Sequence, residues 1–316
     1  MSDSLTSAAR IKFWGVRGSI PTPGPSTVRY GGNTSCVEIR ADGEIIVLDA
    51  GSGIRLLGQS LQREFGSEPI NLALLITHTH WDHIQGLPFF LPAYSPKNQI
   101  RVFGYDGTRT RLGEILADQM ETPFFPVSLS ELPGKIAIEE LKEMEFEIGR
   151  VRVRSKFLNH PGVCAGYRVY TSAGSVAFLP DNEPFEQLEE QMRNRGIENN
   201  GVRQFKSARD ERADLVEFLR DSDVLILDAQ YTDEEYQTHV GWGHGSISSV
   251  VSLAAEADVK RLILFHHDPN HDDAMVDRMV EKARMQIAQA GKSITVEAAQ
   301  EGSELILNSP ALVRSA

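Results

Sequence analysis

Three histidines and one aspartate fall within six consecutive positions of this sequence, at His78, His80, Asp82 and His83. They directly follow residues 71–76, an apolar run whose length is typical of a buried β-strand. Side chains alternate along an extended chain, so His78 and His80 point to the same side. Asp82 and His83 lie beyond the turn and can face a second point nearby. Because neutral imidazole and carboxylate suit zinc, iron or manganese, the segment can supply two ligands to each of two neighbouring metal ions.

A histidine-rich surface patch or an expression tag is the alternative interpretation of this cluster. A tag would be terminal and uniform, whereas this segment is internal, contains an aspartate and follows a predicted core strand. The spacing His78-x-His80-x-Asp82-His83 resembles the signature of the metallo-β-lactamase superfamily of metallohydrolases. That resemblance implies a site for two metal ions, with further ligands later in the chain.

The resemblance assigns three further ligands, each directly after a predicted strand. His160 follows the alternating residues 151–157, and Asp181 follows residues 175–179. His266 is the first residue after the buried strand predicted for 261–265, with His267 as the alternative. The family pattern then places His78, His80 and His160 on the first metal, Asp82, His83 and His266 on the second, and Asp181 between the two ions. We expect two divalent cations, zinc as the first choice and manganese or iron as alternatives.

Two aspartates refine this assignment. The zinc β-lactamases that share the histidine signature have a cysteine where Asp181 falls, whereas a carboxylate bridge suits phosphoester hydrolysis by two close ions. Cys164 lies on the wrong element to take that place. Asp49, at the end of the strand predicted for 44–48, matches an Asp-Gly element of the superfamily. We expect it to orient the ligand segment through hydrogen bonds rather than to serve as a plain helix N-cap.

His244 lies in a glycine-rich segment directly before the helical stretch 247–257. The positive end of that helix dipole is expected to favour the neutral imidazole. The position resembles the catalytic histidine of the tRNA 3′-processing nucleases and related phosphodiesterases. We therefore expect His244 to act as the acid for the leaving oxygen, with Asp82 assisting proton removal.

Two sets of loops are candidates for contact with the substrate. Polar side chains in the glycine-rich N-terminal loops could bind a substrate phosphate, support the metal ligands or merely turn the chain: Arg17, Ser19, Asn33 and Ser35. The aromatic, proline-broken segments around Phe89 and Phe125 form either a lid over the metals or core packing at the edge of the fold.

Every candidate ligand lies at the C-terminal end of a predicted strand, and both halves of the chain read as strands with helices between them. We expect an α/β fold, the αββα sandwich of the superfamily, in which two mixed β-sheets pack face to face with helices on the outer faces. One domain is expected over residues 11–308. A disordered N-terminus, 1–10, precedes it, and a tail, 309–316, follows it.

The composition bears on the partners and the compartment. The net charge is −12 and there is no lysine- or arginine-rich block, which argues against a long nucleic acid as a partner. Only Cys36 and Cys164 occur, too few for a disulfide framework. No apolar run reaches transmembrane length. We therefore expect a cytoplasmic protein that does not contact a membrane.

Together these features predict a dinuclear metal-dependent hydrolase, a phosphodiesterase that acts on small phosphodiesters or cyclic nucleotides through a metal-bridging hydroxide. The expected partner is a small phosphodiester, with no long nucleic acid and no membrane, and a homodimer is allowed. Three alternatives stay open. They are a tRNA 3′-processing endonuclease, for which the sequence shows no basic arm, a carboxylic ester or lactone hydrolase, which would not need His244, and a metal-binding sensory domain without catalysis.

Overall fold

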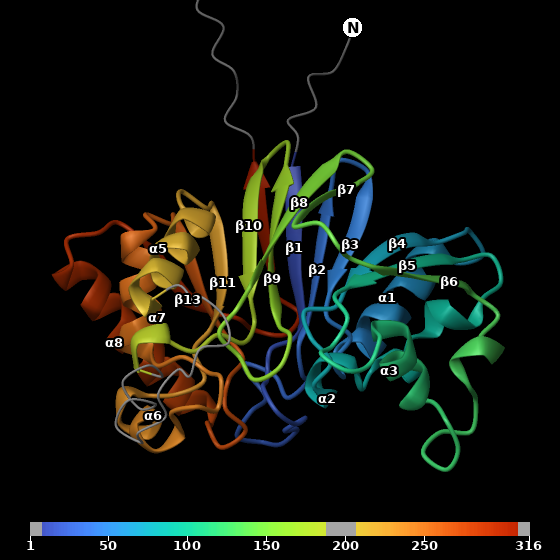
Figure 1. Ribbon diagram of the computed structural model, residues 1–316, viewed down its shortest axis with the longest axis horizontal. Helices are drawn as coiled ribbons and strands as arrows, with labels where there is room; N and C mark the ends of the chain where they lie inside the picture. The colour runs from blue at the N-terminus through green and yellow to red at the C-terminus, as the bar shows by residue number, and fades with distance from the viewer. Residues whose placement is uncertain (1–7, 188–206, 309–316) are drawn as a thin grey trace, which may run out of the picture.

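The computed structural model describes residues 8–187 and 207–308, which form two seven-stranded β-sheets packed face to face with helices on both outer sides (Figure 1). The first sheet has the order β14 (Glu304–Asn308), β1 (Ala8–Gly15), β2 (Cys36–Ala41), β3 (Glu44–Leu48), β4 (Asn71–Leu75), β5 (Gln99–Gly104) and β6 (Lys135–Glu140). The second has the order β13 (Thr295–Ala298), β12 (Arg261–Phe265), β11 (Val224–Asp228), β10 (Gly174–Leu179), β9 (Ala165–Thr171), β8 (Val151–Phe157) and β7 (Glu145–Ile148). The predicted αββα sandwich of two mixed sheets is confirmed.

Each sheet has an antiparallel half and a parallel half. Strands β14, β1, β2 and β3 are antiparallel, and β3 to β6 are parallel. Strands β7 to β10 are antiparallel, and β10 to β13 are parallel. Both faces of a central parallel strand are covered, so such a strand needs a continuous apolar run. The sequences of β4 (NLALL), β11 (VLILD) and β12 (RLILF) have this form.

Helices cover the outer face of each sheet. The first sheet carries α1 (Ile54–Phe65), η1 (Leu87–Phe89), η2 (Leu91–Tyr94), α3 (Leu112–Asp118) and η3 (Leu129–Glu131) on the right of Figure 1. The second carries α5 (Ala208–Leu219), α7 (Ile247–Glu256) and α8 (Asp273–Gln289) on the left. Helix α1 buries Ile54, Leu57 and Leu61, whose spacing of three and four residues gives one apolar face. None of the described helices is long and apolar enough to cross a membrane.

The core forms three apolar layers, one between the sheets and one beneath each set of helices. In the middle layer the ring of Phe265 lies 6.5 Å from that of Phe13 and 5.4 Å from that of Phe178, so residues from both sheets interdigitate. This packing fixes the two sheets relative to one another. The loops after β4, β8, β10 and β12 then meet at one edge between the sheets, near the short helix α2 (Trp81–Ile84) at the bottom of Figure 1.

The first strand differs from the prediction. It begins at Ala8 rather than at residue 11, because Ala8 pairs with Asn308 and Arg10 pairs with both Ile306 and Arg40. The prediction of a disordered N-terminus is therefore wrong for residues 8–10. These residues are ordered by pairing with β14, the last strand of the chain, and the local sequence carries no sign of so distant a partner. Residues 1–7, residues 188–206 and the tail 309–316 lie outside the described residues.

Candidate metal centre and active site

The seven predicted metal ligands lie together at the edge between the sheets. They form two groups whose ligand atoms lie within 4.8 Å of one another: His78, His80, His160 and Asp181, and Asp82, His83 and His266. Six of the seven side chains are buried, and His80 is exposed. Residues from both halves of the chain therefore build one compact site that opens to solvent beside His80.

Asp181 turns one carboxylate oxygen toward histidines of the first group and the other toward histidines of the second. Its Oδ2 lies 3.7 Å from Nε2 of His78 and 3.6 Å from Nε2 of His160. Its Oδ1 lies 3.1 Å from Nε2 of His83 and 3.4 Å from Nε2 of His266. With this placement, Asp181 would be able to help hold two adjacent cations.

Several buried atoms of the site need a partner that the protein does not provide. Nε2 of His78, Nε2 of His83 and Oδ1 of Asp181 have no hydrogen-bond partner among the described residues. Leaving a buried polar atom unsatisfied costs about 1–3 kcal/mol. Cations between the two groups would satisfy all three atoms, so the donor set fits a pair of divalent metal ions.

The protonation states also suit metal binding. Burial lowers the pKa of His78, and the neighbouring His83 lowers it further, so its nitrogen keeps a free lone pair. Burial alone would raise the pKa of Asp181, but the surrounding histidines, His266 first, hold it well below its usual range. Asp82 is kept ionised in the same way by His83 and His266. The centre therefore offers a neutral imidazole at His78 beside ionised carboxylates at Asp82 and Asp181. Burial alone would lower the pKa of His83, but these carboxylates, Asp82 first, raise it well above its usual range.

Groups behind the imidazoles hold their outer nitrogens, so that Nε2 faces the centre. The pairs are Nδ1 of His83 with Oδ2 of Asp49 at 2.7 Å, Nδ1 of His160 with the carbonyl of Gly243 at 2.9 Å, and Nδ1 of His266 with Oε1 of Gln230 at 2.8 Å. Such partners set the orientation of a ligand ring. Gln230 and Gly243 were missed from the sequence. Gln230 lies two residues after the buried strand β11. Position after a buried strand is the same signal that pointed to the ligands, so it could also have identified Gln230.

Asp49 joins three segments at the base of the site. Its Oδ1 accepts hydrogen bonds from the backbone N–H and the hydroxyl of Thr77, both at 2.9 Å, and its Oδ2 accepts one from the hydroxyl of Ser35 at 2.9 Å. With a φ of 63°, Asp49 has a backbone conformation that only a minority of non-glycine residues adopt. The contact with His83 means that this carboxylate aims one ligand while it anchors the segment that carries the others.

A matched pair of glycines tests whether the backbone aims His160. Gly243 and Gly162 have φ values of 91° and 92°, but a Cβ at Gly243 would overlap the His160 ring, whereas one at Gly162 would meet nothing within 4 Å. Both alanine variants pay a similar backbone penalty of about 1–2 kcal/mol. We expect Gly243→Ala to lose bound metal and Gly162→Ala to retain it, measured as metal per chain after dialysis. Equal metal content in the two variants would contradict this role of the Gly243 backbone.

His244 lies against the second group of ligands. Its Nδ1 is 3.0 Å from Oδ2 of Asp228, and its ring stacks on that of His266 at 4.9 Å. Burial alone would lower the pKa of His244, but Asp228, the larger of the nearby charges, raises it to about 9. The predicted preference for the neutral form is therefore wrong, because a carboxylate at hydrogen-bond distance outweighs the partial charge of a helix end. Asp228 therefore favours the protonated imidazole of His244.

His266, not His267, faces the centre. The ring of His267 is fully turned away and its Nε2 lies 3.0 Å from the carbonyl of Ala299, while burial lowers its pKa to about 3. His266 has a φ of 60°, and a Cβ at Gly18 would overlap its ring, so the loop before β2 packs directly against this imidazole. The alternative of His267 is thus excluded by geometry.

Of the roles left open for the four N-terminal loop residues, the structure favours support of the loops over substrate contact for three side chains. Arg17 is 0% exposed and donates to the carbonyls of Gly31, Asp268 and His271. The amide of Asn33 donates to Glu301 at 3.0 Å, and the buried hydroxyl of Ser35 donates to Asp49. These side chains connect loops to one another instead. Ser19 supports the site through its backbone N–H, which donates to Oδ2 of Asp82 at 2.8 Å.

Cys164 lies nearer to the site than the sequence suggested. Its Sγ is 3.6 Å from Nδ1 of His78 and 3.8 Å from the carbonyl oxygen of Asp181. Burial raises the pKa of this thiol, which therefore stays protonated. Cys164 contacts the outer nitrogen of His78, so it packs behind the ligands.

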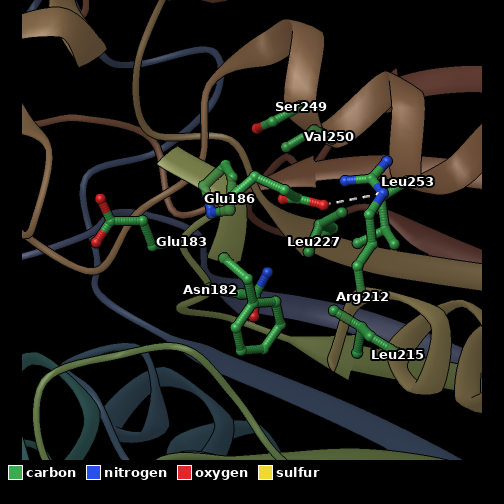
Figure 2. A pocket seen from close by; sticks show the side chains of 11 residues that line it. Asn182, Glu183, Glu186, Arg212, Leu215, Leu227, Ser249, Val250 and Leu253 are labelled. Atoms are coloured by element: carbon green, nitrogen blue, oxygen red, sulfur yellow. Dashed lines mark ion pairs between the residues drawn. The ribbon is translucent and has the colours of Figure 1, made fainter. Parts of the chain in front are cut away.

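The aromatic rings of Phe89 and Phe125 pack against each other, and the cavity lined by Asn182 and Glu183 is small. Phe89 and Phe125 pack edge to face at 5.6 Å, and Phe90 is buried beneath α1. The cavity lined by Asn182, Glu183 and residues of α5 and α7, shown in Figure 2, has a volume of about 20 Å³, room for roughly one water molecule. Glu183 turns away from the ion pair between Arg212 and Glu186 in this view. The cavity is too small for a substrate, and the prediction of a lid stays a prediction.

Comparisons with known proteins agree with this geometry. The family model "Beta-lactamase superfamily domain" matches residues 44–197. Ribonuclease Z of Thermoplasma acidophilum is 26% identical over 92% of this chain and 95% of its own length, and that of Haloarcula marismortui is 23% identical over 87% and 91%. Among solved structures, human tRNase Z, short form, covers 94% of this chain and 98% of its own with a TM-score of 0.58 at 19% identity. The metallo-β-lactamase fold protein YhfI from Bacillus subtilis covers 95% and 99% with a TM-score of 0.64 at 14% identity.

The curated relatives correct one prediction. These relatives are named Ribonuclease Z and align with most of the chain. Their name overturns the expectation that no long nucleic acid is a partner. A net charge is summed over the whole molecule, so it does not report the local field at a site that holds cations. On the fold, the ligand set and these relatives together, the chain is a metal-dependent hydrolase with the metallo-β-lactamase fold, and it is similar over most of its length to the ribonuclease Z proteins.

Proposed function

We propose that this hydrolase cleaves phosphodiester bonds in RNA, in the manner of a tRNA 3′-processing endonuclease. The observation that carries the proposal is the placement of Asp181, which turns one oxygen to each histidine group while His244 lies beside them. Two cations held close together suit in-line displacement at phosphorus. A lactone or carboxylic ester hydrolase would have no use for the acid at His244.

The metal ions are proposed to be zinc, because five of the seven ligands are histidines and imidazole suits zinc well. The first ion would be held by His78, His80 and His160, the second by Asp82, His83 and His266, and both by Asp181. When bound, the ions would neutralise phosphate charge and lower the pKa of a water molecule to near 7. With Cys36 and Cys164 free and buried, the protein is suited to the reducing cytoplasm.

The residues of the chain have distinct roles in this proposal. The backbone N–H of Ser19 and Nε2 of His266 both lie at hydrogen-bond distance from Oδ2 of Asp82 and fix its position. Asp82 is proposed to assist removal of the proton from the attacking water. His244 has Nδ1 committed to Asp228, so Nε2 is left to donate to the leaving oxygen. Asp228 keeps the imidazole oriented and protonated.

The proposal is tested with a panel of phosphodiesters and the metal-loaded protein. We expect a single endonucleolytic cut in a precursor tRNA that carries a 3′ trailer, resolved by gel electrophoresis. Turnover of cyclic nucleotides with an intact precursor tRNA would instead support a small-molecule phosphodiesterase. Turnover of lactones alone would exclude both.

A further inference from the structure

Two of the three tryptophans lie exposed beside the metal ligands. Trp81 is 78% exposed and Trp242 is 61% exposed, whereas Trp14 is buried and donates its indole N–H to Glu38 at 2.9 Å. Tryptophan is highly buried on average, because its indole has the largest apolar surface of any side chain. Two indoles exposed on segments next to the ligands are free to contact a flat, apolar group.

His160 connects the segments that carry the two indoles. Its Nε2 lies 3.0 Å from Nδ1 of His80, the residue before Trp81. Its Nδ1 lies 2.9 Å from the carbonyl of Gly243, the residue after Trp242. Each tryptophan is therefore the chain neighbour of a residue that contacts His160, a ligand of the first group, whose exposed member is His80.

The loop that carries Trp242 is held in place by a buried carboxylate. Glu183, which is 1% exposed, accepts a hydrogen bond from the backbone N–H of Gly241 at 2.6 Å and from that of Gly243 at 3.0 Å. In Figure 2 this side chain points away from the neighbouring cavity. Both residues that flank Trp242 are thus fixed, so the indole is presented on a rigid loop at little cost in entropy on binding.

A row of aromatic rings links Trp242 to the proposed acid. Its ring meets that of His239 edge-on at 4.8 Å, and His239 stacks on Tyr231 at 4.6 Å. Tyr231 in turn meets the ring of His244 edge-on at 5.9 Å. The indole is therefore supported on one side and set at a fixed position relative to His244.

Building on the RNA phosphodiesterase function, we propose that Trp242 and Trp81 stack on the nucleobases on the two sides of the scissile phosphodiester. Base–aromatic stacking tolerates every base, because each has a π-face. A base in a duplex already stacks on its neighbours and cannot lie on an indole. The substrate is therefore RNA that is unpaired where it is cut, recognised by the presence of bases rather than by their identity.

The test compares an unpaired RNA with the same RNA made abasic at the two nucleotides that flank the cut. Trp242→Ala and Trp81→Ala are each expected to raise KM about 5- to 100-fold on the normal RNA and to leave kcat near its normal value. On the abasic RNA these variants should match the unmodified enzyme. Trp242→Phe should restore part of the affinity. Met285→Ala is the control, since Met285 is 58% exposed on the outer helix α8.

Two results would overturn the stacking role. One is an equal loss on normal and abasic RNA, which would make the indoles structural, and the other is no loss at all. A binding measurement keeps this question separate from cleavage. Quenching of tryptophan fluorescence by unpaired RNA is expected in the metal-loaded His244→Ala protein and should weaken in its Trp242→Ala derivative. Quenching without cleavage by the unmodified enzyme would refute the RNA hydrolase function and leave the stacking intact.

Discussion

Replacing His244 by alanine is expected to lower kcat for phosphodiester cleavage by about 10²- to 10⁴-fold, the range found when a positioned general acid is lost. The reason is that the Asp228 carboxylate at 3.0 Å keeps this imidazole protonated beside the ligands. The seven proposed ligands remain, so bound metal should be unchanged. Turnover of precursor tRNA or bis(p-nitrophenyl) phosphate is measured together with metal per chain.

Metal analysis is the decisive control for His244. Its ligand atom lies within 4.8 Å of those of Asp181 and His266, so an imidazole there has the geometry of a ligand as well as of an acid. If His244→Ala loses an ion, His244 is a ligand and its role as the acid is refuted. Undiminished turnover in the variant would refute both roles.

Asp228→Asn separates orientation from charge at the same position. Asparagine can still hydrogen-bond Nδ1 of His244, but it removes the negative charge that raises the pKa of His244 to about 9. A step that needs protonated His244 slows as pH rises through this pKa. The variant should therefore lose activity at a lower pH than the unmodified enzyme. If the variant loses activity at the same alkaline pH as the unmodified enzyme, the titration of a group other than His244 causes that loss.

The sequence could predict the fold and the ligands because their signals are local. The apolar runs of β4, β11 and β12 identify central strands without any knowledge of their neighbours. A ligand directly after such a strand needs no long-range information either, because parallel strands in one sheet end at a common edge. His78 was found in this way, the resemblance to the superfamily then assigned His266 after another such strand, and the structure brings the two into one site.

What the sequence could not predict depends on contacts between distant segments. In the sequence of its own loop, Arg17 resembles a residue that binds phosphate. In the structure its guanidinium donates hydrogen bonds to the carbonyls of Asp268 and His271, about 250 positions later. The protonation of His244 follows from Asp228, which lies on a different strand end. Glu183 follows Asp181 by two residues, and only the folded chain shows that it holds the loop around Trp242. Residue type alone cannot tell a substrate contact from a support.

Asp181→Ala is expected to have the largest effect of any single substitution, because one side chain serves both ions. Its two oxygens lie 3.1–3.7 Å from the Nε2 atoms of His78, His83, His160 and His266. The variant should bind less metal and lose about 10³-fold or more in kcat, since each tenfold loss of rate needs only about 1.4 kcal/mol of lost transition-state stabilisation.

Thermal stability gives a second measure that does not depend on the substrate. A ligand that binds only the folded state raises Tm, so chelation of the metals should lower the Tm of the unmodified protein. In Asp181→Ala the same treatment should change Tm much less, because less metal is bound at the start. Asp223→Asn is the matched control, since this carboxylate accepts a hydrogen bond from Ser175 at the start of β10, at the other end of the strand that precedes Asp181. A full chelation effect in Asp181→Ala would mean that the ions are held without a bridging carboxylate, and the two-ion site proposed for this chain would have to be abandoned.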